Sequence, residues 1–160
     1  MHIALEGNIG AGKSYLVEVF KKHLKSIEVL DEAVDEWENI KFEDGDGILT
    51  KFYKDMTRYS FTMEINCIAD RLIRIINAQQ KHIVTARSWE TDRRVFVKGL
   101  LENGCIDKAE VQIYDNVIKV IGMIGNINPT CYIYLRVTPE KCFERIKKRG
   151  RESEKNLSFD

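Results

Sequence analysis

The amino-acid sequence predicts an α/β fold in which a parallel sheet is flanked by helices. Short apolar segments alternate along the chain with amphipathic helical patterns, an order that is typical of β-α-β units. A glycine-rich loop follows the first apolar segment. The 25 basic and 25 acidic residues leave no net charge, so the chain has no overall field to hold a nucleic-acid polymer or an anionic membrane surface. A small-molecule partner is therefore expected.

The predicted strands are short segments rich in Ile, Val, Leu and Tyr. They comprise residues 2–5, 27–30, 82–85 and 131–137. Apolar runs of this length suit strands that are buried on both faces of a parallel sheet. Ligands of such sheets bind at the carboxyl ends of the strands, so the residues that follow each segment are the first candidates for a site.

The predicted helices are marked by apolar residues that recur every three or four positions. Three stripes are formed by Leu16, Phe20 and Leu24, by Ile65, Ile68, Leu72 and Ile76, and by Tyr114, Val117, Ile118 and Ile121. A fourth helix should begin after Pro139, because proline suits the first turn. It carries Cys142, Phe143 and Ile146 on one side.

The length of 160 residues predicts one domain that covers residues 1–160. The sequence has no apolar run of about 18 residues, so no membrane span is expected, and its N-terminus lacks the features of a signal peptide. The four cysteines form no CxxC pair, which argues against a zinc site or a disulfide framework. Reduced thiols suit an intracellular location, and a cytoplasmic one is expected.

The glycine-rich loop fits the pattern GxxxxGK[ST] in full, with a strand before it and a helix after it. It consists of Gly7, Asn8, Ile9, Gly10, Ala11, Gly12, Lys13 and Ser14. Its backbone N–H groups can surround a phosphate at a helix N-terminus. Lys13 can reach the β- and γ-phosphates of ATP, and the Ser14 hydroxyl can hold Mg²⁺. The pattern predicts a P-loop nucleotide-binding fold, but it leaves open which molecule receives the phosphate.

Further polar motifs follow the other strands. Asp31-Glu32 and Trp37 follow the second strand, Arg87-Ser88 ends the third, and several arginines lie on the fourth helix. In these motifs and their order the chain resembles the deoxyribonucleoside kinase family, in its deoxycytidine and deoxyguanosine kinase branch, from residue 3 to about 160. The resemblance implies ATP-dependent phosphorylation of the 5′-hydroxyl of a deoxyribonucleoside and a homodimer.

The catalytic residues follow from that resemblance. Glu32 matches the base that takes the proton from the 5′-hydroxyl. Arg87 matches the arginine that stabilises the transferring phosphoryl group, beside Lys13. A lid at about residues 144–154 is expected to close over ATP; its matching arginines are Arg145, Arg149 and Arg151. Without the resemblance, these three arginines would also fit an exposed basic helix face.

The resemblance also assigns the walls of the nucleoside site. Tyr53 and Glu154 match the pair that hydrogen-bonds the 3′-hydroxyl of the sugar. Trp37 and Phe96 match the aromatic walls around the base, where stacking contributes affinity more than selectivity. These four positions predict a deoxyribose site with an intact 3′-hydroxyl.

Selection of the base is expected from Glu64, Arg71 and Asp92. An ionised Asp92 only accepts hydrogen bonds, so it suits a base with an exocyclic amino group. Thymine has a carbonyl oxygen at that position, and two acceptors would face each other. Glu64 stands where most of the family has Gln, and its acceptors suit the adjacent N1–H and N2–H of guanine. The sequence therefore predicts a purine or cytosine deoxynucleoside, with deoxyguanosine ahead. Alternatively, Glu64 pairs with Arg71 or Arg74 on the helix surface.

Two departures from the family pattern keep other functions open. Ala86 replaces the acid that helps to hold Mg²⁺, leaving Ser14, waters and Glu32 around the metal. The sequence also stops at Asp160, so it is expected to lack the family's C-terminal strand, as a fragment or a minimal member. One alternative is a non-catalytic assembly subunit, which retention of the motif residues disfavours. Another is a nucleoside-monophosphate kinase, for which a second arginine-rich site is lacking.

Overall fold

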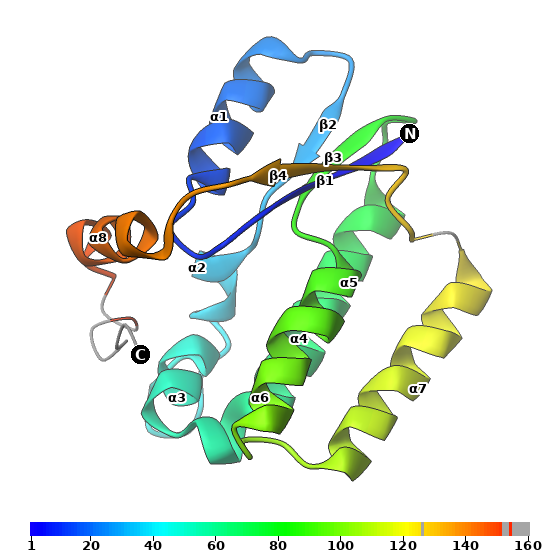
Figure 1. The fold of residues 1–160 in the computed structure, drawn as a ribbon. Helices are drawn as coiled ribbons and strands as arrows, with labels where there is room; N and C mark the ends of the chain where they lie inside the picture. Colours follow the sequence, from blue (N-terminus) through cyan, green and yellow to red (C-terminus); the bar gives the residue numbers. More distant parts are fainter. Residues whose placement is uncertain (126, 152–153, 155–160) are drawn as a thin grey trace. The chain divides into compact units, whose positions relative to one another are not determined.

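The computed structural model describes residues 1–125, 127–151 and 154. Contacts divide the chain into two compact units (Figure 1). The sheet unit comprises Met1–Glu32, Asn77–Ser88 and Pro129–Asp160, and the helical unit comprises Ala33–Ile76 and Trp89–Asn128. The P-loop and the residues after the first three strands therefore belong to the same unit.

The sheet unit contains a four-stranded parallel sheet with the strand order β2-β3-β1-β4. The strands are β1 (His2–Gly7), β2 (Glu28–Leu30), β3 (Ile83–Ala86) and β4 (Cys131–Leu135). All four predicted strands and their parallel arrangement are confirmed. The bounds differ mainly at two strand ends. β1 continues through Glu6 to Gly7, where it pairs with Leu135, and β4 ends at Leu135 although it was predicted to continue to residue 137.

Helix α1 (Lys13–His23) covers one face of this sheet. Its Val17 is fully buried among Leu5, Val84 and Ala86, and Leu16 and Phe20 pack against the same group. The other apolar side chains packed there are Ile3, Ile27, Val29, Ile133 and Leu135. The predicted apolar stripe of this helix is thus confirmed for Leu16 and Phe20. Burial of this face anchors the helix whose first residue is Lys13.

Helix α8 (Pro139–Arg149) begins beside the P-loop. The Thr138 hydroxyl accepts a hydrogen bond from the backbone N–H of Lys141, and Pro139 lies in the first turn, as predicted. Cys142 is buried. A Cβ atom at Gly10 would lie 2.4 Å from the carbonyl oxygen of Cys142. Only glycine at this position lets the phosphate loop approach α8 so closely.

The helical unit consists of one long helix, a second long helix and several short segments. They are α2 (Val34–Trp37), α3 (Ile48–Lys54), α4 (Met56–Asn77), α5 (Trp89–Thr91), the π-helical η1 (Asp92–Val97), α6 (Lys98–Glu102) and α7 (Lys108–Ile124). Its main core joins Ile68 and Leu72 of α4 to Tyr114 of α7. Ile76, predicted at the end of the α4 stripe, is instead 61% exposed.

The π-helical segment η1 follows the short helix α5 after β3. Asp92, its first residue, is 3% exposed, and Val97, its last, is fully buried. The wider turn of a π-helix shifts the register of a helix face and is common at functional sites. Here the carboxylate of Asp92 lies in the core of the helical unit.

Within the part of the chain that the structure describes, no helix combines the length and the apolar character that a membrane span requires.

Candidate active site

The phosphate loop is shaped by three glycines with positive φ. Gly7, Gly10 and Gly12 have φ values of 148°, 80° and 105°, which other residues adopt only at a cost. The ammonium group of Lys13 donates hydrogen bonds to the carbonyl oxygens of Gly7, at 2.9 Å, and Asn8, at 3.0 Å. The lysine is therefore held over the loop that it is predicted to assist, while Ser14 beside it is exposed.

The surroundings of Lys13 favour the loss of its proton. Burial, and next the guanidinium of Arg87, lower the pKa of Lys13 from 10.5 to about 8, although the carboxylates of Glu32 and Glu6 act in the opposite direction. Such effects require that these charges lie near the ammonium group. Two cations, Lys13 and Arg87, and two carboxylates, Glu32 and Glu6, therefore lie together near the carboxyl ends of β1, β2 and β3.

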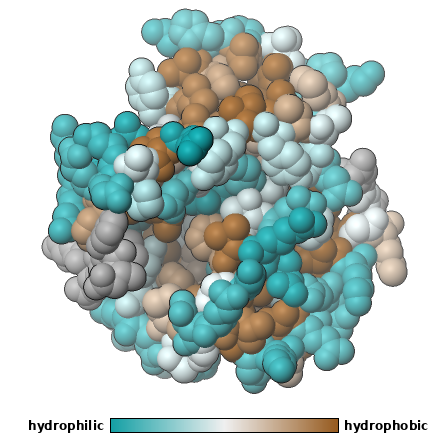
Figure 2. All heavy atoms as spheres, in the orientation of Figure 1, coloured by the Kyte–Doolittle hydropathy of each residue, from teal (hydrophilic) through white to brown (hydrophobic). Residues whose placement is uncertain are grey.

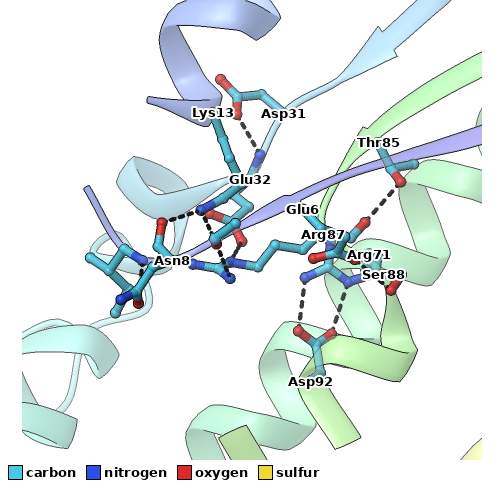
Figure 3. Close-up of polar contacts among 12 residues, drawn as sticks. Glu6, Asn8, Lys13, Asp31, Glu32, Arg71, Thr85, Arg87, Ser88 and Asp92 are labelled. Atoms are coloured by element: carbon cyan, nitrogen blue, oxygen red, sulfur yellow. Dashed lines mark hydrogen bonds and ion pairs between the residues drawn. The ribbon is translucent and has the colours of Figure 1, made fainter. Parts of the chain in front are cut away.

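Arg87 connects the ends of the strands. Its Nε lies 2.7 Å from Oε1 of Glu32, and its Nη1 donates to the Gly7 carbonyl at 3.2 Å (Figure 3). Its backbone φ is 66°, in the left-handed region. Among the described residues, all others with a positive φ are glycines. Its peptide N–H donates to the Leu5 carbonyl at 3.0 Å. Both the backbone and the side chain of Arg87 are therefore fixed against β1.

Glu32 faces the phosphate loop. Its side chain is 20% exposed and is directed toward Arg87, and its peptide N–H donates to Oδ1 of Asp31 at 2.8 Å. Burial raises the pKa of Asp31, with smaller contributions from the charges of Glu32 and Glu18 in the same direction. Glu32 is thus oriented by its neighbour Asp31 and by Arg87, which follows β3, while part of its side chain remains accessible.

Glu6 is a buried acid that the sequence analysis did not select. Ser88 donates a hydrogen bond to its Oε1 at 2.7 Å. Its Oε2 is buried and has no hydrogen-bond partner among the described residues. The sequence did contain a signal for Glu6: it is a charged residue near the end of an otherwise apolar strand. A buried charge without a partner is costly, so such a residue is expected to have a specific role. Glu6 adds a second carboxylate to the group around Lys13.

The predicted lid arginines have two different partners. Arg145 donates from Nη1 to the carbonyl of Ala11 at 3.0 Å. Arg149 binds both carboxylate oxygens of Glu154 at 2.7 and 2.6 Å, and Arg151 lies 3.4 Å from Oε1 of that carboxylate. Residues 152–153 of the predicted lid lie outside the described residues. Arg145 thus touches the phosphate loop, whereas Arg149 and Arg151 hold a buried glutamate.

In the helical unit, the three predicted base-selecting residues are all buried. Arg71 of α4 donates from Nε and Nη2 to the two carboxylate oxygens of Asp92, at 2.8 and 3.1 Å. Burial raises the pKa of Tyr114, and the nearby carboxylates of Asp92 and Glu64 raise it further. Glu64 therefore belongs to a buried polar cluster with Arg71, Asp92 and Tyr114.

This burial corrects part of one interpretation of Glu64. Glu64 is 6% exposed, so it does not lie on the helix surface, whereas its pairing with Arg71 stays a prediction. Arg74, one of the partners considered, binds Asp70 at 3.0 Å and Glu36 at 2.7 Å instead. Tyr114 was predicted only as a core residue. Its hydroxyl is buried and has no hydrogen-bond partner among the described residues. The charges of Asp92, Glu64 and Arg71, which act on the pKa of Tyr114, are the evidence that it lies beside the polar cluster.

The predicted aromatic walls also lie in the helical unit. Trp37 is buried among Ile48, Leu49 and Met63, and Tyr53 packs against the same group. Phe96 is half-buried on η1. Tyr53 belongs to the helical unit and Glu154 to the sheet unit, so their joint binding of a 3′-hydroxyl stays a prediction.

Comparisons with known proteins agree with these motifs. The family model for deoxynucleoside kinases matches residues 3–160. The chain is 33% identical to deoxycytidine kinase 2 of Gallus gallus, over 99% of this chain and 68% of that protein. It is 31% identical to deoxycytidine kinase of Mus musculus, over 99% and 69%, and 34% identical to deoxyadenosine kinase of Dictyostelium discoideum, over 99% and 61%.

The chain spans about two thirds of the length of these relatives. The match nevertheless includes the phosphate loop, the acid after β2 and the arginine after β3. It confirms the predicted enzyme class and does not favour a nucleoside-monophosphate kinase or an assembly subunit. On the match from residue 3 to residue 160, the chain belongs to the deoxynucleoside kinase family.

Proposed function

We propose that this chain transfers the γ-phosphoryl group of ATP to the 5′-hydroxyl of a deoxyribonucleoside and so forms the 5′-monophosphate. The observation that carries the proposal is the 2.7 Å ion pair between Glu32 and Arg87, with Arg87 also bound to the Gly7 carbonyl of the phosphate loop. A base and a cation for phosphoryl transfer thus share the edge of one sheet with Lys13.

Each of these residues has one task in the proposed reaction. The loop N–H groups and Lys13 bind the β- and γ-phosphates. Glu32 accepts the proton of the 5′-hydroxyl as that oxygen attacks phosphorus, and the bond from the γ-phosphorus to the bridging oxygen breaks, releasing ADP. Arg87 stabilises the charge on the transferring group. Arg145, Arg149 and Arg151 are proposed to close over ATP.

Magnesium is the metal that this reaction requires, and the residues around the phosphate loop fit it. Mg²⁺ is usually held by one or two carboxylates, substrate phosphates and several waters. Ser14 is exposed beside Lys13, and the Glu32 carboxylate lies near the same lysine; these two would hold the ion. When bound, the metal neutralises charge on the β- and γ-phosphates. Ala86, which replaces a family acid, is buried against the α1 face and offers no ligand.

The nucleoside is proposed to lie between Trp37 and Phe96, with Tyr53 and Glu154 on its 3′-hydroxyl. Arg71 binds Asp92 through two hydrogen bonds, which fixes the carboxylate for an exocyclic amino group. Glu64 belongs to the same buried cluster and adds acceptors for adjacent N–H donors. We therefore propose deoxyguanosine ahead of deoxycytidine, with thymidine a poor substrate.

A homodimer is proposed through α4 and α7. Large apolar side chains are exposed on both helices, with exposed fractions of 58% for Ile73, 61% for Ile76, 57% for Val120 and 84% for Met123. Figure 2 shows hydrophobic side chains at the surface among hydrophilic ones on one face of the protein. Exposed apolar groups of this kind mark interaction surfaces.

An intracellular, cytoplasmic location is also proposed. The four cysteines are free thiols, and reduced thiols suit such a compartment.

Replacement of Glu32 by Gln tests the proposed base. The amide cannot accept the 5′-hydroxyl proton, so kcat should fall by roughly 100-fold or more, which is the usual contribution of general-base catalysis. Steady-state phosphorylation of deoxyguanosine measures this change. Glu18→Gln, on the exposed face of α1, is the matched control and should keep wild-type turnover. Equal kcat values for Glu32→Gln and the wild type would remove Glu32 from the mechanism.

Replacement of Glu64 by Gln tests base selection. An amide loses one acceptor and gains a donor, so the ratio of kcat/KM for deoxyguanosine to that for deoxycytidine should fall by about tenfold, the effect expected of one mismatched buried hydrogen bond. The measurement is a panel of the four common deoxynucleosides with both proteins. Thymidine as the best wild-type substrate would contradict the assignment of Asp92 and Glu64.

The lowered pKa of Lys13 predicts a pH-dependent affinity for ATP. Lys13 is protonated below about pH 8 and neutral above it in the free enzyme. The KM for ATP should therefore rise by up to about tenfold between pH 7 and pH 9. Lys13→Arg, whose guanidinium stays charged, should show a much flatter profile. A wild-type KM that is constant to pH 10 would show that the ammonium group does not contribute to ATP binding.

The pH dependence of folding stability through Lys13 has the opposite sign to that of ATP affinity. Between about pH 8 and the ordinary pKa of 10.5, the unfolded chain binds more protons at Lys13 than the folded chain does. The contribution of this residue to stability therefore rises with pH across that window. A loss of ATP affinity there cannot be attributed to unfolding through Lys13.

Replacement of Met123 by Glu tests the proposed dimer. A carboxylate at this 84% exposed position leaves the monomer fold intact but would have to be desolvated in an interface of α4 and α7. Sedimentation equilibrium should show a dimer for the wild type and a monomer for the variant. A wild-type monomer at micromolar concentration would refute the dimer and leave the catalytic proposal unaffected.

A further inference from the structure

A buried chain of hydrogen bonds leads from the beginning of β1 to the backbone of Arg87. Nε2 of His2 lies 2.9 Å from Oγ1 of Thr85. The same hydroxyl donates to the carbonyl oxygen of Arg87 at 2.8 Å, a contact visible in Figure 3. Thr85 is 2% exposed, Arg87 is 6% exposed and His2 is 9% exposed. None of the roles assigned so far requires His2 or Thr85.

The chemistry of the groups fixes the direction of the chain. A carbonyl oxygen only accepts, so the single hydrogen of the Thr85 hydroxyl is used on Arg87. The hydroxyl oxygen must then accept from His2, which requires a hydrogen on Nε2 of the imidazole. His2 therefore orients the Thr85 hydroxyl, and Thr85 binds the Arg87 carbonyl.

Arg87 needs such support because its backbone is strained. With a φ of 66° it is in the left-handed region, which is unfavourable for residues other than glycine, asparagine and aspartate. Strain of this kind persists only where the surroundings fix the conformation, and it is concentrated at functional sites. The Arg87 peptide N–H is held by Leu5 and its carbonyl by Thr85. These two hydrogen bonds together fix the backbone of Arg87 and therefore the direction of its side chain.

We propose that His2 and Thr85 are positioning residues for phosphoryl transfer. They hold Arg87 in the left-handed conformation that directs its guanidinium to Glu32 and to the Gly7 carbonyl. They act through Arg87 and do not touch substrate, since His2 begins β1 and Thr85 lies within β3. The inference rests on the proposed function in so far as Arg87 acts on the transferring group.

Thr85→Val tests this role, because valine keeps the shape of the side chain and removes the hydroxyl. The expected result is a fall in kcat of at least tenfold with the KM values for ATP and nucleoside within about twofold of the wild type. Thr85→Ser keeps a hydroxyl and should recover most of the rate. Thr130→Val is the matched control: its hydroxyl accepts from the His2 peptide N–H at 3.0 Å and does not reach Arg87, so kcat should stay within twofold.

A spectroscopic readout separates positioning from a general loss of structure. In the ligand-free protein, Thr85→Val should shift the ¹⁵N resonance of His2 Nε2 and the Nε–H resonance of Arg87, while Thr130→Val should leave the Arg87 resonance in place. His2→Leu provides a second variant should Thr85→Val not fold. It removes the ring donor and should lower kcat at least threefold, and His2→Gln, whose amide can donate, should restore it.

The outcomes distinguish this inference from the proposed function. If Arg87→Ala abolishes turnover while Thr85→Val and His2→Leu keep wild-type kcat, the positioning role is refuted and the proposed function stands. If Arg87→Ala keeps its turnover, the catalytic role of Arg87 fails, and the positioning role fails with it. A fall in kcat for Thr85→Val that Thr85→Ser does not recover would also overturn the inference.

Discussion

The ion pair between Glu32 and Arg87 is the interaction on which the site depends. It joins the second residue after β2 to the first residue after β3, and the Arg87 guanidinium also reaches the Gly7 carbonyl at the end of β1. Removing one partner of a largely buried pair leaves an uncompensated charge, which costs several kcal/mol. The proposed base, the proposed phosphoryl-stabilising cation and the phosphate loop therefore hold one another in place within a single sheet.

The same charges explain how a buried lysine can serve a phosphate site. Desolvation and Arg87 lower the pKa of Lys13 to about 8, and Glu32 and Glu6 limit that effect. Binding an anionic phosphate would restore the balance, since an opposite charge favours the protonated ammonium.

Local patterns in the sequence predicted much of this arrangement. The phosphate loop, the four strands and the start of α8 at Pro139 each depend on a few adjacent residues, and the structure has them where they were expected. Burial of Glu64 and the exposure of Ile76 depend on which face of α4 meets the rest of the helical unit, so periodicity alone could not separate them. The contacts of His2 with Thr85 and of Glu6 with Ser88 span 83 and 82 positions of the chain, so no local pattern reveals them.

The central claim is that Glu32 acts on the nucleoside that accepts the phosphoryl group, while the phosphate loop binds the ATP that donates it. A crystal structure with deoxyguanosine and a non-hydrolysable ATP analogue tests it most directly. The expected result is a Glu32 carboxylate oxygen within about 2.6–3.2 Å of the 5′-oxygen, with Arg87 between that oxygen and the γ-phosphate. A nucleoside whose 5′-oxygen lies against a different acid, with Glu32 turned away from it, would contradict the account.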